Sequence, residues 1–282
     1  MDYGLGDFFM RPSNIHATRL VLIGLIIACG PGFMPAPTFA QDTITVSSCE
    51  GQEQIPVKFE IDCSRVQDSA VKRSCRPFIV NVACKVFPAY RRITGIHLEE
   101  TCPAIKYTIY EKSNWPHPPG EGGLALECGV DYISDYSLKF RSKLGPYDVH
   151  EILHEYQSVL GALPKAHALF GPSMTEAMRE IGDPAYEARF AEMKKEVANI
   201  EDQFHKGAVK SGDSCVLAET AVEERLYIQN PRTVYSFYRD LVRGRLKDQA
   251  DREARFNRMY VQASGGQEWV RKFLLEHGCA PF

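Results

Sequence analysis

The 282-residue sequence has neither an excess nor a cluster of basic residues. Lys and Arg number 33 against 36 Asp and Glu, a net charge of −3, so no nucleic acid or other polyanion is expected as a partner. The sequence contains no C-x-x-C pair, which argues against a metal site built from cysteines. It also contains no internal repeat and no low-complexity tract, so we expect an ordinary globular fold.

No hydrophobic run is long enough to span a bilayer as a permanent helix. The apolar stretch 20–28 has only about nine residues, whereas a membrane-spanning helix needs about twenty. This stretch follows Arg11 and Arg19, an arrangement typical of a targeting signal. We therefore expect residues 1–40 to be a signal peptide rather than part of the fold.

Two processing sites compete at the end of this signal. Thr38 and Ala40 are small residues at the −3 and −1 positions that signal peptidase requires. Alternatively, the signal covers 1–28, and Cys29 is acylated as in a bacterial lipoprotein, the one case in which we expect membrane attachment. We favour cleavage after Ala40 because the proline-rich stretch 31–37 suits a signal-peptide c-region.

The cysteine count also indicates export. Without Cys29, eight of the nine cysteines remain, an even number that allows up to four disulfides in a secreted, periplasmic or cell-envelope protein. Eight cysteines allow 105 pairings, so the sequence does not give the connectivity. The eight are Cys49, Cys63, Cys75, Cys84, Cys102, Cys128, Cys215 and Cys279.

The hydrophobic pattern predicts an α+β fold in two parts. A β-rich subdomain is expected over 41–145 and a helical subdomain over 146–282. Strands are predicted at 56–61, 77–82, 105–110, 122–127 and 132–140, from alternation or from β-branched and aromatic residues. Helices are predicted from about 146 to 161, at 173–179, around 190–204, at 234–245 and at 268–276.

The stretch around His150-Glu151-x-x-His154 carries the chemistry. It is the H-E-x-x-H pattern of zinc hydrolases, in which two histidines four residues apart share one face of a helix. At about 100° per residue, Glu151 lies at the rim of that face, where it can hold a water rather than the metal. The opposite face is apolar, through residues such as Ile152 and Tyr156, and is expected to be buried.

Catalytic zinc usually has three protein ligands, so a third is needed. The position six residues after His154 is Leu160, which rules out the immediate His of one zincin class. A Glu about twenty residues downstream is the other solution, and Glu176 lies 22 residues after His154. Thr175-Glu176-Ala177 and the H-E-x-x-H motif together resemble the gluzincin metallopeptidases over about residues 148–180.

This resemblance implies a zincin-like fold with Zn²⁺ held by His150, His154 and Glu176. It also implies a sheet whose edge strand lines the cleft and pairs with an extended peptide. That edge strand would be 127–134 or 132–140. Glu180, one turn after Glu176, would orient the ring of His150.

Alternatives to these site residues remain open. Ser173-x-x-Glu176 is also a capping box, in which the Glu would bond the Ser amide instead of a metal. His167 and Asp183 are rival third ligands. Glu180 could equally be a solvated charge on its helix.

The expected activity is peptide-bond hydrolysis, with Glu151 as the general base toward a zinc-activated water. Gluzincins stabilise the oxyanion with a side chain from the helical half, and the candidates are Tyr227, Tyr235, Tyr238 and His205. Two other interpretations remain. The chain could be a non-peptidase zinc hydrolase or degenerate zincin, or a disulfide-stapled, non-catalytic binding protein with an incidental motif.

Overall fold

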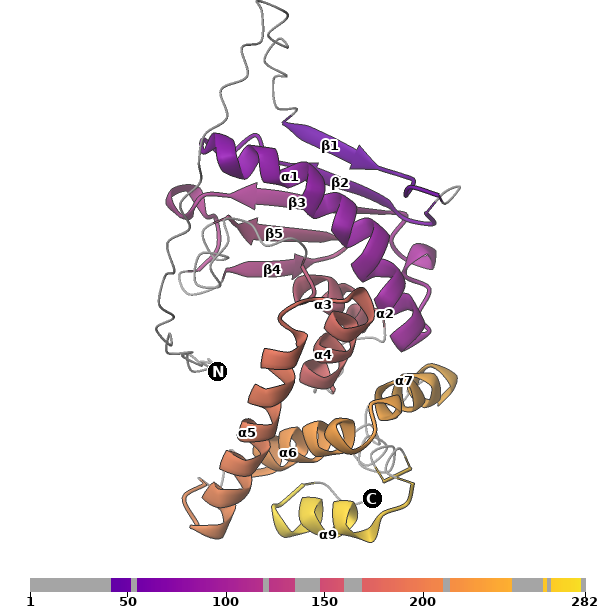
Figure 1. The fold of residues 1–282 in the computed structure, drawn as a ribbon, viewed down its shortest axis with the longest axis vertical. Coiled ribbons are helices and arrows are strands. Elements are labelled where there is room, and N and C mark those ends of the chain that lie inside the picture. The colour runs from indigo at the N-terminus through magenta and orange to yellow at the C-terminus, as the bar shows by residue number, and fades with distance from the viewer. Residues whose placement is uncertain are drawn as a thin grey trace, which may run out of the picture. The chain divides into compact units, whose positions relative to one another are not determined.

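A computed structural model of the chain describes residues 42–51, 55–118, 122–134, 148–159, 169–209, 214–244, 261–262 and 265–279 (Figure 1). All of them belong to one unit in the pattern of contacts, Ala40–Phe282. The expected signal peptide, and with it Cys29, lies outside the described residues. Within the described part of the chain, every helix is too short or too polar to cross a membrane.

The centre of the fold is a five-stranded mixed sheet, with strand order β1-β2-β3-β5-β4. Its strands are β1 (Thr43–Val46), β2 (Lys58–Asp62), β3 (Ala104–Tyr110), β4 (Gly123–Leu126) and β5 (Gly129–Ile133). The three central strands run parallel, while β1 and β4 are antiparallel edge strands. The predicted strands 56–61 and 105–110 are confirmed as β2 and β3.

One face of the sheet forms the core with the helices that connect β2 to β3. The register pairs Phe59 with Ile105 and Ile61 with Tyr107, so these buried side chains point to the same face. Phe59 packs edge-on against Phe87 of α2 at 5.3 Å between ring centroids. Figure 1 shows the helical connection lying across the sheet, as a crossover between parallel strands requires.

This connection corrects the prediction of a β-rich N-terminal half. α1 (Ser69–Asn81), the π-helical segment Val82–Val86 and α2 (Phe87–Thr94) follow one another without a break. The predicted strand 77–82 is therefore wrong. Asp68 begins α1 by accepting a hydrogen bond from the amide of Ala70 at 2.7 Å, and the buried Val71, Cys75, Phe78 and Ile79 recur at helical spacing.

The edge strand beside the helical part is also different from the prediction. β5, which takes up most of 127–134, lies between β3 and β4 and so is not an edge. The edge strand is β4. It falls within the stretch 122–127, which was predicted as a strand but not as the edge strand. Of the other proposed edge strand, 132–140, the residues after 134 lie outside the described ones. Two short 3₁₀ turns, Leu98–Glu100 and Lys112–Asn114, flank β3.

Among the described residues from 148 onward, every regular element is a helix. These helices are α3 (Glu151–Ser158), α4 (Phe170–Ile181), α5 (Tyr186–His205), α6 (Ser214–Gln229), α7 (Arg232–Gly244) and α9 (Glu268–Glu276). α3 packs against β4, β5, α2 and α4, and α4 packs against α2, α5, α6 and α7. The helix that carries the H-E-x-x-H motif thus lies between the sheet edge and the helical part.

Eight cysteines form four disulfides, as their even number indicated. The pairs are Cys49–Cys84, Cys63–Cys75, Cys102–Cys128 and Cys215–Cys279. Such a density of disulfides is typical of chains that fold in an oxidising compartment outside the cytoplasm. The last pair ties α6 to the end of the described chain beyond α9, across 64 residues.

Candidate functional site

Asp148 sets the start of the motif helix. Its Oδ1 accepts hydrogen bonds from the backbone amides of His150 at 2.8 Å and Glu151 at 3.0 Å, and its Oδ2 accepts one from the hydroxyl of Tyr107 on β3. Burial raises the pKa of Asp148 to about 6, and the bonds from the amides of His150 and Glu151 oppose that rise. Through these bonds, Asp148 links the first turn of α3 to Tyr107 of the sheet.

The apolar face of α3 is buried as the sequence predicted. Ile152, Leu153 and Tyr156 have no measurable exposure, and the Tyr156 hydroxyl donates to the carbonyl of Phe87 on α2 at 2.9 Å. With this face fixed in the core, the motif histidines are held on the other side of the helix.

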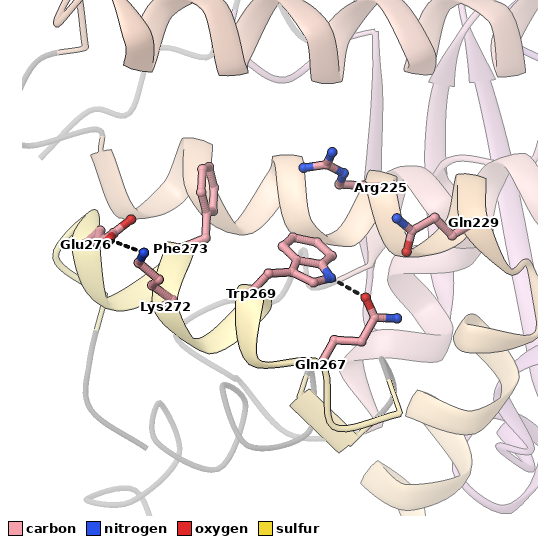
Figure 2. A pocket seen from close by; sticks show the side chains of 7 residues that line it. All are labelled: Arg225, Gln229, Gln267, Trp269, Lys272, Phe273 and Glu276. Carbon is pink, nitrogen blue, oxygen red and sulfur yellow. Dashed lines mark hydrogen bonds and ion pairs between the residues drawn. The ribbon is translucent and has the colours of Figure 1, made fainter.

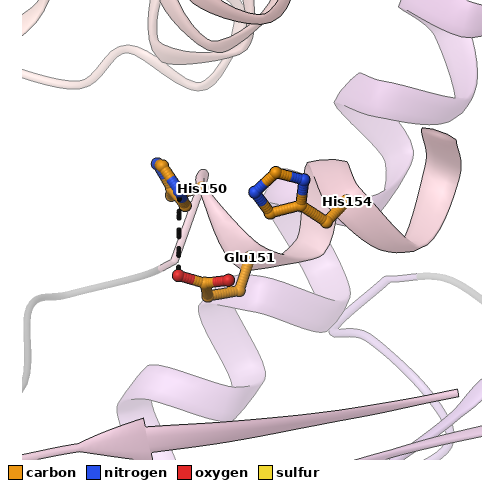
Figure 3. Close-up of side chains that lie close together, drawn as sticks. All are labelled: His150, Glu151 and His154. Carbon is orange, nitrogen blue, oxygen red and sulfur yellow. Dashed lines mark ion pairs between the residues drawn. The ribbon is translucent and has the colours of Figure 1, made fainter. Parts of the chain in front are cut away.

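His150, Glu151 and His154 converge (Figure 3). One potential ligand atom from each lies within 4.8 Å of the other two. The two imidazole ring centroids are 5.2 Å apart, and Nε2 of His150 lies 3.8 Å from Oε1 of Glu151. The three side chains are thus close enough to act on one ion and one water.

His150 and Glu151 differ in their exposure to solvent. The His150 side chain is 53% exposed, whereas the Glu151 side chain is only 9% exposed. The Glu151 carboxylate lies against Gly123 of β4, where an added β-carbon would stand 2.7 Å from its Cγ and Cδ. A side chain at position 123 would collide with this carboxylate, so glycine creates the space that Glu151 occupies.

Phe170, the first residue of α4, packs against both motif histidines. Its ring centroid lies 4.8 Å from that of His150 and 4.6 Å from that of His154, on which it stacks. Sequence analysis missed this residue, since nothing in the local pattern links it to the motif. The Gly122-Gly123 pair within a predicted strand, by contrast, was a signal for a close approach that could have been noticed.

Glu155 is a second buried acid on α3, one turn after Glu151. It is 1% exposed, and burial raises its pKa to about 7, while the backbone amides of Cys128 and Gly129 oppose that rise. Glu155 therefore faces the β4–β5 turn rather than the histidines.

Glu176 is fully buried on α4, and its carboxylate has four hydrogen-bond donors. Arg179 donates from Nη2 to Oε1 at 2.5 Å and from Nε to Oε2 at 2.9 Å. The hydroxyl of Tyr235 donates to Oε1 at 2.7 Å, and that of Tyr227 to Oε2 at 2.9 Å. The grouping of potential ligand atoms around His150 and His154 does not include Glu176. Its role as third ligand stays a prediction.

The capping-box alternative for Glu176 is wrong. α4 begins at Phe170, so Ser173 lies inside the helix instead of capping it. Its hydroxyl donates to the carbonyl of Leu169 at 2.6 Å. Of the rival ligands, Asp183 accepts from the amide of Ala185 just after α4, and His167 lies outside the described residues.

Glu180 lies beside Glu176 in the same network. Its Oε1 accepts from the hydroxyl of Tyr235, and its Oε2 accepts from Nη2 of Arg92 at 2.6 Å and from Nε at 2.9 Å. The alternative, a solvated charge on the helix surface, fits only in part, because the Glu180 side chain is 14% exposed and paired with Arg92. Its predicted role of orienting His150 remains untested.

The four candidates for oxyanion stabilisation have different surroundings. Tyr227 and Tyr235 bond Glu176, and burial raises the pKa of both, so both hydroxyls are protonated donors at neutral pH. Tyr238 is buried on α7, and its hydroxyl oxygen accepts hydrogen bonds from Nε2 of Gln157 on α3 and from the hydroxyl of Ser173 on α4. His205 is exposed at the end of α5, where its Nδ1 lies 2.7 Å from the carbonyl of Glu201.

Two other features of the described residues lie apart from the motif. Cys215, Glu219 and Cys279 lie close together, but the two sulfurs form a disulfide and are not thiolate ligands. A cavity of about 570 Å³ lies between α6 and α9, with Trp269, Phe273 and Arg225 in its wall (Figure 2). None of the motif residues lines that cavity.

The chain matches no protein-family model, and neither a curated protein nor a solved structure resembles it significantly. Function must therefore be argued from the geometry of the site.

Proposed function

We propose that this protein is an exported, zinc-dependent metallopeptidase. The observation that carries the proposal is the convergence of His150, Glu151 and His154 within 4.8 Å at the start of a helix beside an edge strand. Two histidines on an amphipathic surface helix would not require a buried carboxylate between them and the sheet. The four disulfides support the exported location.

The donor set suits zinc. Two imidazoles four residues apart on one helix face are ligands that zinc prefers, and Glu151 lies to one side of them. The proposed third ligand is Glu176 on α4, a helix that packs against α3. A zinc ion held there supplies Lewis-acid chemistry, polarising a carbonyl and acidifying a water.

Glu151 is the proton carrier in this proposal. Its carboxylate accepts a proton from the attacking water and delivers it to the leaving amine. Its position against Gly123 restricts the rotamers it can adopt. The carboxylate is therefore preorganised for proton transfer. Asp148 contributes by fixing the first turn of α3, and so the backbone of both His150 and Glu151.

The edge strand supplies a binding mode for the substrate. Among the described strands, β4 pairs with β5 alone, so its other edge can accept an extended peptide as an added strand. Because Gly123 of β4 touches Glu151, a peptide bound along this edge would pass close to the catalytic base.

A non-catalytic binding protein is the second candidate. Two observations favour it: Phe170 packs on both histidines, and Arg179 occupies the Glu176 carboxylate. A degenerate zincin would tolerate both contacts, whereas an active enzyme must accommodate a metal beside them.

Metal analysis and one substitution test the proposal. Purified protein should contain about one zinc per chain, His154→Ala should lose it, and a chelator should lower the melting temperature of the wild type. Glu151→Gln should retain zinc and lose peptide hydrolysis by at least about 10²-fold, measured on a fluorogenic peptide library. Glu155→Gln, the same change one turn along α3, is the matched control and should stay active. A wild type without zinc, or a zinc protein that cleaves no peptide, would reject the peptidase.

A further inference from the structure

Leu169, the residue just before α4, has a backbone conformation that leucine seldom adopts. Its φ is +54° and its ψ is +24°, in the left-handed region where a β-carbon is crowded. Within the described part of the chain, only Leu169 and Cys128 combine a side chain with a positive φ. Such a conformation persists where the surrounding structure imposes it, and it is concentrated at functional sites. The contacts around Leu169 must therefore outweigh the cost of its conformation.

Three kinds of contact hold Leu169. Its side chain is fully buried. Its amide, a buried donor that needs an acceptor, donates to Oε2 of Glu223 on α6 at 2.7 Å. Its carbonyl accepts from the amide of Ser173 at 2.8 Å and from the hydroxyl of Ser173 at 2.6 Å. Glu223 thus attaches the start of α4 to α6, and it is itself only 7% exposed.

The residue that follows Leu169 is Phe170, whose ring contacts both motif histidines. Its centroid lies 4.6 Å from that of His154, and the two rings are stacked with 29° between their planes. It lies 4.8 Å from the centroid of His150, at 67°. The two imidazoles are 5.2 Å apart at 74°, so each of the three rings contacts the other two. One aromatic side chain therefore restricts the orientation of both imidazoles.

Stacking on His154 leaves its nitrogens available to an ion. The lone pair of an imidazole nitrogen lies in the plane of the ring, whereas a stacked ring covers the face. Phe170 has no polar atom with which to compete as a ligand. With Phe170 in place, one ligand atom each of His150, Glu151 and His154 lies within 4.8 Å of the other two. The contact is therefore compatible with an ion shared by the two histidines.

We infer that Phe170 is a positioning residue for the metal ligands. Its ring fixes the two imidazoles in the orientation that brings their nitrogens together, and Glu223 fixes Phe170 through the amide of Leu169. This inference rests on the proposed function. It gives to an aromatic ring the orienting role that hydrogen-bonded side chains have at many metal sites. The flat ring is then required, and not only its apolar volume.

Two pairs of substitutions distinguish orientation from packing. Phe170→Leu keeps a large apolar side chain but removes the ring, and zinc affinity should fall by about tenfold. Phe170→Tyr keeps the ring, and its added hydroxyl can reach water because Phe170 is only half-buried, so it should bind zinc as the wild type does. Glu223→Ala removes the acceptor of the Leu169 amide and should weaken zinc binding by about three- to tenfold. Glu223→Gln keeps an acceptor oxygen and should restore the affinity.

The experiment measures zinc affinity by competition with a chromogenic chelator, on the full mature chain. The visible spectrum of the Co²⁺-substituted protein reports the arrangement of the ligands, and it should change in Phe170→Leu. The NMR shifts of the His154 ring protons in chelator-treated protein report the stack without any metal. Phe190→Leu is the matched control, because the described ring contacts of Phe190 are with Tyr186 and Tyr227. It should leave the affinity and the spectrum unchanged.

The outcomes separate this inference from the proposed function. If the wild type binds no zinc, the proposed function fails and the positioning role fails with it. If the wild type binds zinc and Phe170→Leu lowers only the melting temperature, with affinity and Co²⁺ spectrum unchanged, the positioning role fails alone. Tighter zinc binding in Phe170→Leu would also overturn it, because Phe170 would then hinder the ion. Should Phe170→Leu fail to fold, the comparison of Glu223→Ala with Glu223→Gln carries the test.

Discussion

The side chain of Glu151 fills the space that a β-carbon on Gly123 would need. A methyl group built on Gly123 would lie 2.7 Å from Cγ and Cδ of Glu151 and closer still to Oε1. Heavy atoms do not approach to such distances, so either the carboxylate or the edge strand would have to move. The contact joins the proposed base to the strand along which a peptide would bind.

Gly123→Ala should therefore impair hydrolysis without removing the metal. A displacement of about 1 Å at a catalytic group can cost about 10²-fold in rate, and we expect a fall of about 10–100-fold in kcat/KM. Zinc content should be unchanged because the three atoms nearest to the added β-carbon all belong to Glu151, and not to either histidine. At Gly129 on the neighbouring strand, an added β-carbon would lie 3.3 Å from the carbonyl oxygen of Lys106 and 3.8 Å from Cβ of Leu126, so Gly129→Ala serves as the control. Equal activity in the two variants would contradict the assigned contact.

The motif helix could be predicted from the sequence because its pattern is local. The apolar residues of α3 recur at helical spacing, and the same phase places His150 and His154 together on the opposite side. Asp148, just before the helix, accepts hydrogen bonds from the amides of His150 and Glu151, as an acidic residue at a helix start commonly does. Residues within one or two turns decide these features, so one sequence is sufficient to find them.

The strand predicted at 77–82 failed because tertiary packing outweighed local propensity. Ile79, Val80 and Val82 favour strands, but the cap at Asp68 and the burial of Phe78 against Tyr107 favour the crossover helix. The prediction of the edge strand was wrong for a different reason. The stretch 122–127 was predicted as a strand and contains β4, but the order of strands in a sheet is a long-range property that a local pattern does not give.

The surroundings of Glu176 could not be predicted for the same long-range reason. Tyr227 and Tyr235 lie 51 and 59 residues further along the chain. The sequence indicated them only as possible oxyanion donors, one role among several open to a tyrosine. No local spacing indicates that both hydroxyls meet on one carboxylate.

Glu224 should make the stability of the protein depend on pH. It is 2% exposed on α6, and burial raises its pKa to about 9, with the negative charge of Glu196 adding to the rise and Arg189 opposing it. Between pH 4.5 and 9 the folded state holds a proton that the unfolded state has lost. The free energy of unfolding contributed by this group therefore falls as the pH rises through that window.

Glu224→Gln should remove this dependence. At pH 8 we expect the variant to be more stable than the wild type by about 1–3 kcal/mol, and the difference should vanish toward pH 4.5. Urea unfolding of both proteins between pH 4.5 and 8.5 measures it. Glu276 is an exposed glutamate on α9, and its variant Glu276→Gln should show the same pH dependence of the free energy of unfolding as the wild type. If Glu224→Gln shows the same pH dependence of the free energy of unfolding as the wild type, the buried carboxyl does not stay protonated in the folded state.

The disulfide Cys215–Cys279 should contribute more to stability than Cys63–Cys75. It closes a loop with a sequence separation of 64 residues, against 12 for the other pair. Constraining the unfolded chain over these lengths is worth about 4 kcal/mol and about 3 kcal/mol respectively. The cross-link also holds α9 beside α6, where the ring of Phe273 packs against Phe204 of α5.

Replacing both cysteines of each pair by serine, and comparing urea midpoints, tests this order. The Cys215→Ser/Cys279→Ser protein should lose more stability, and its α9 should become the first segment cut by a protease. Zinc content should stay the same in that variant, because neither α9 nor its disulfide contacts the motif residues among the described contacts. A larger loss from the 12-residue pair would show that strain or packing, and not the entropy of the unfolded chain, decides what these cross-links are worth.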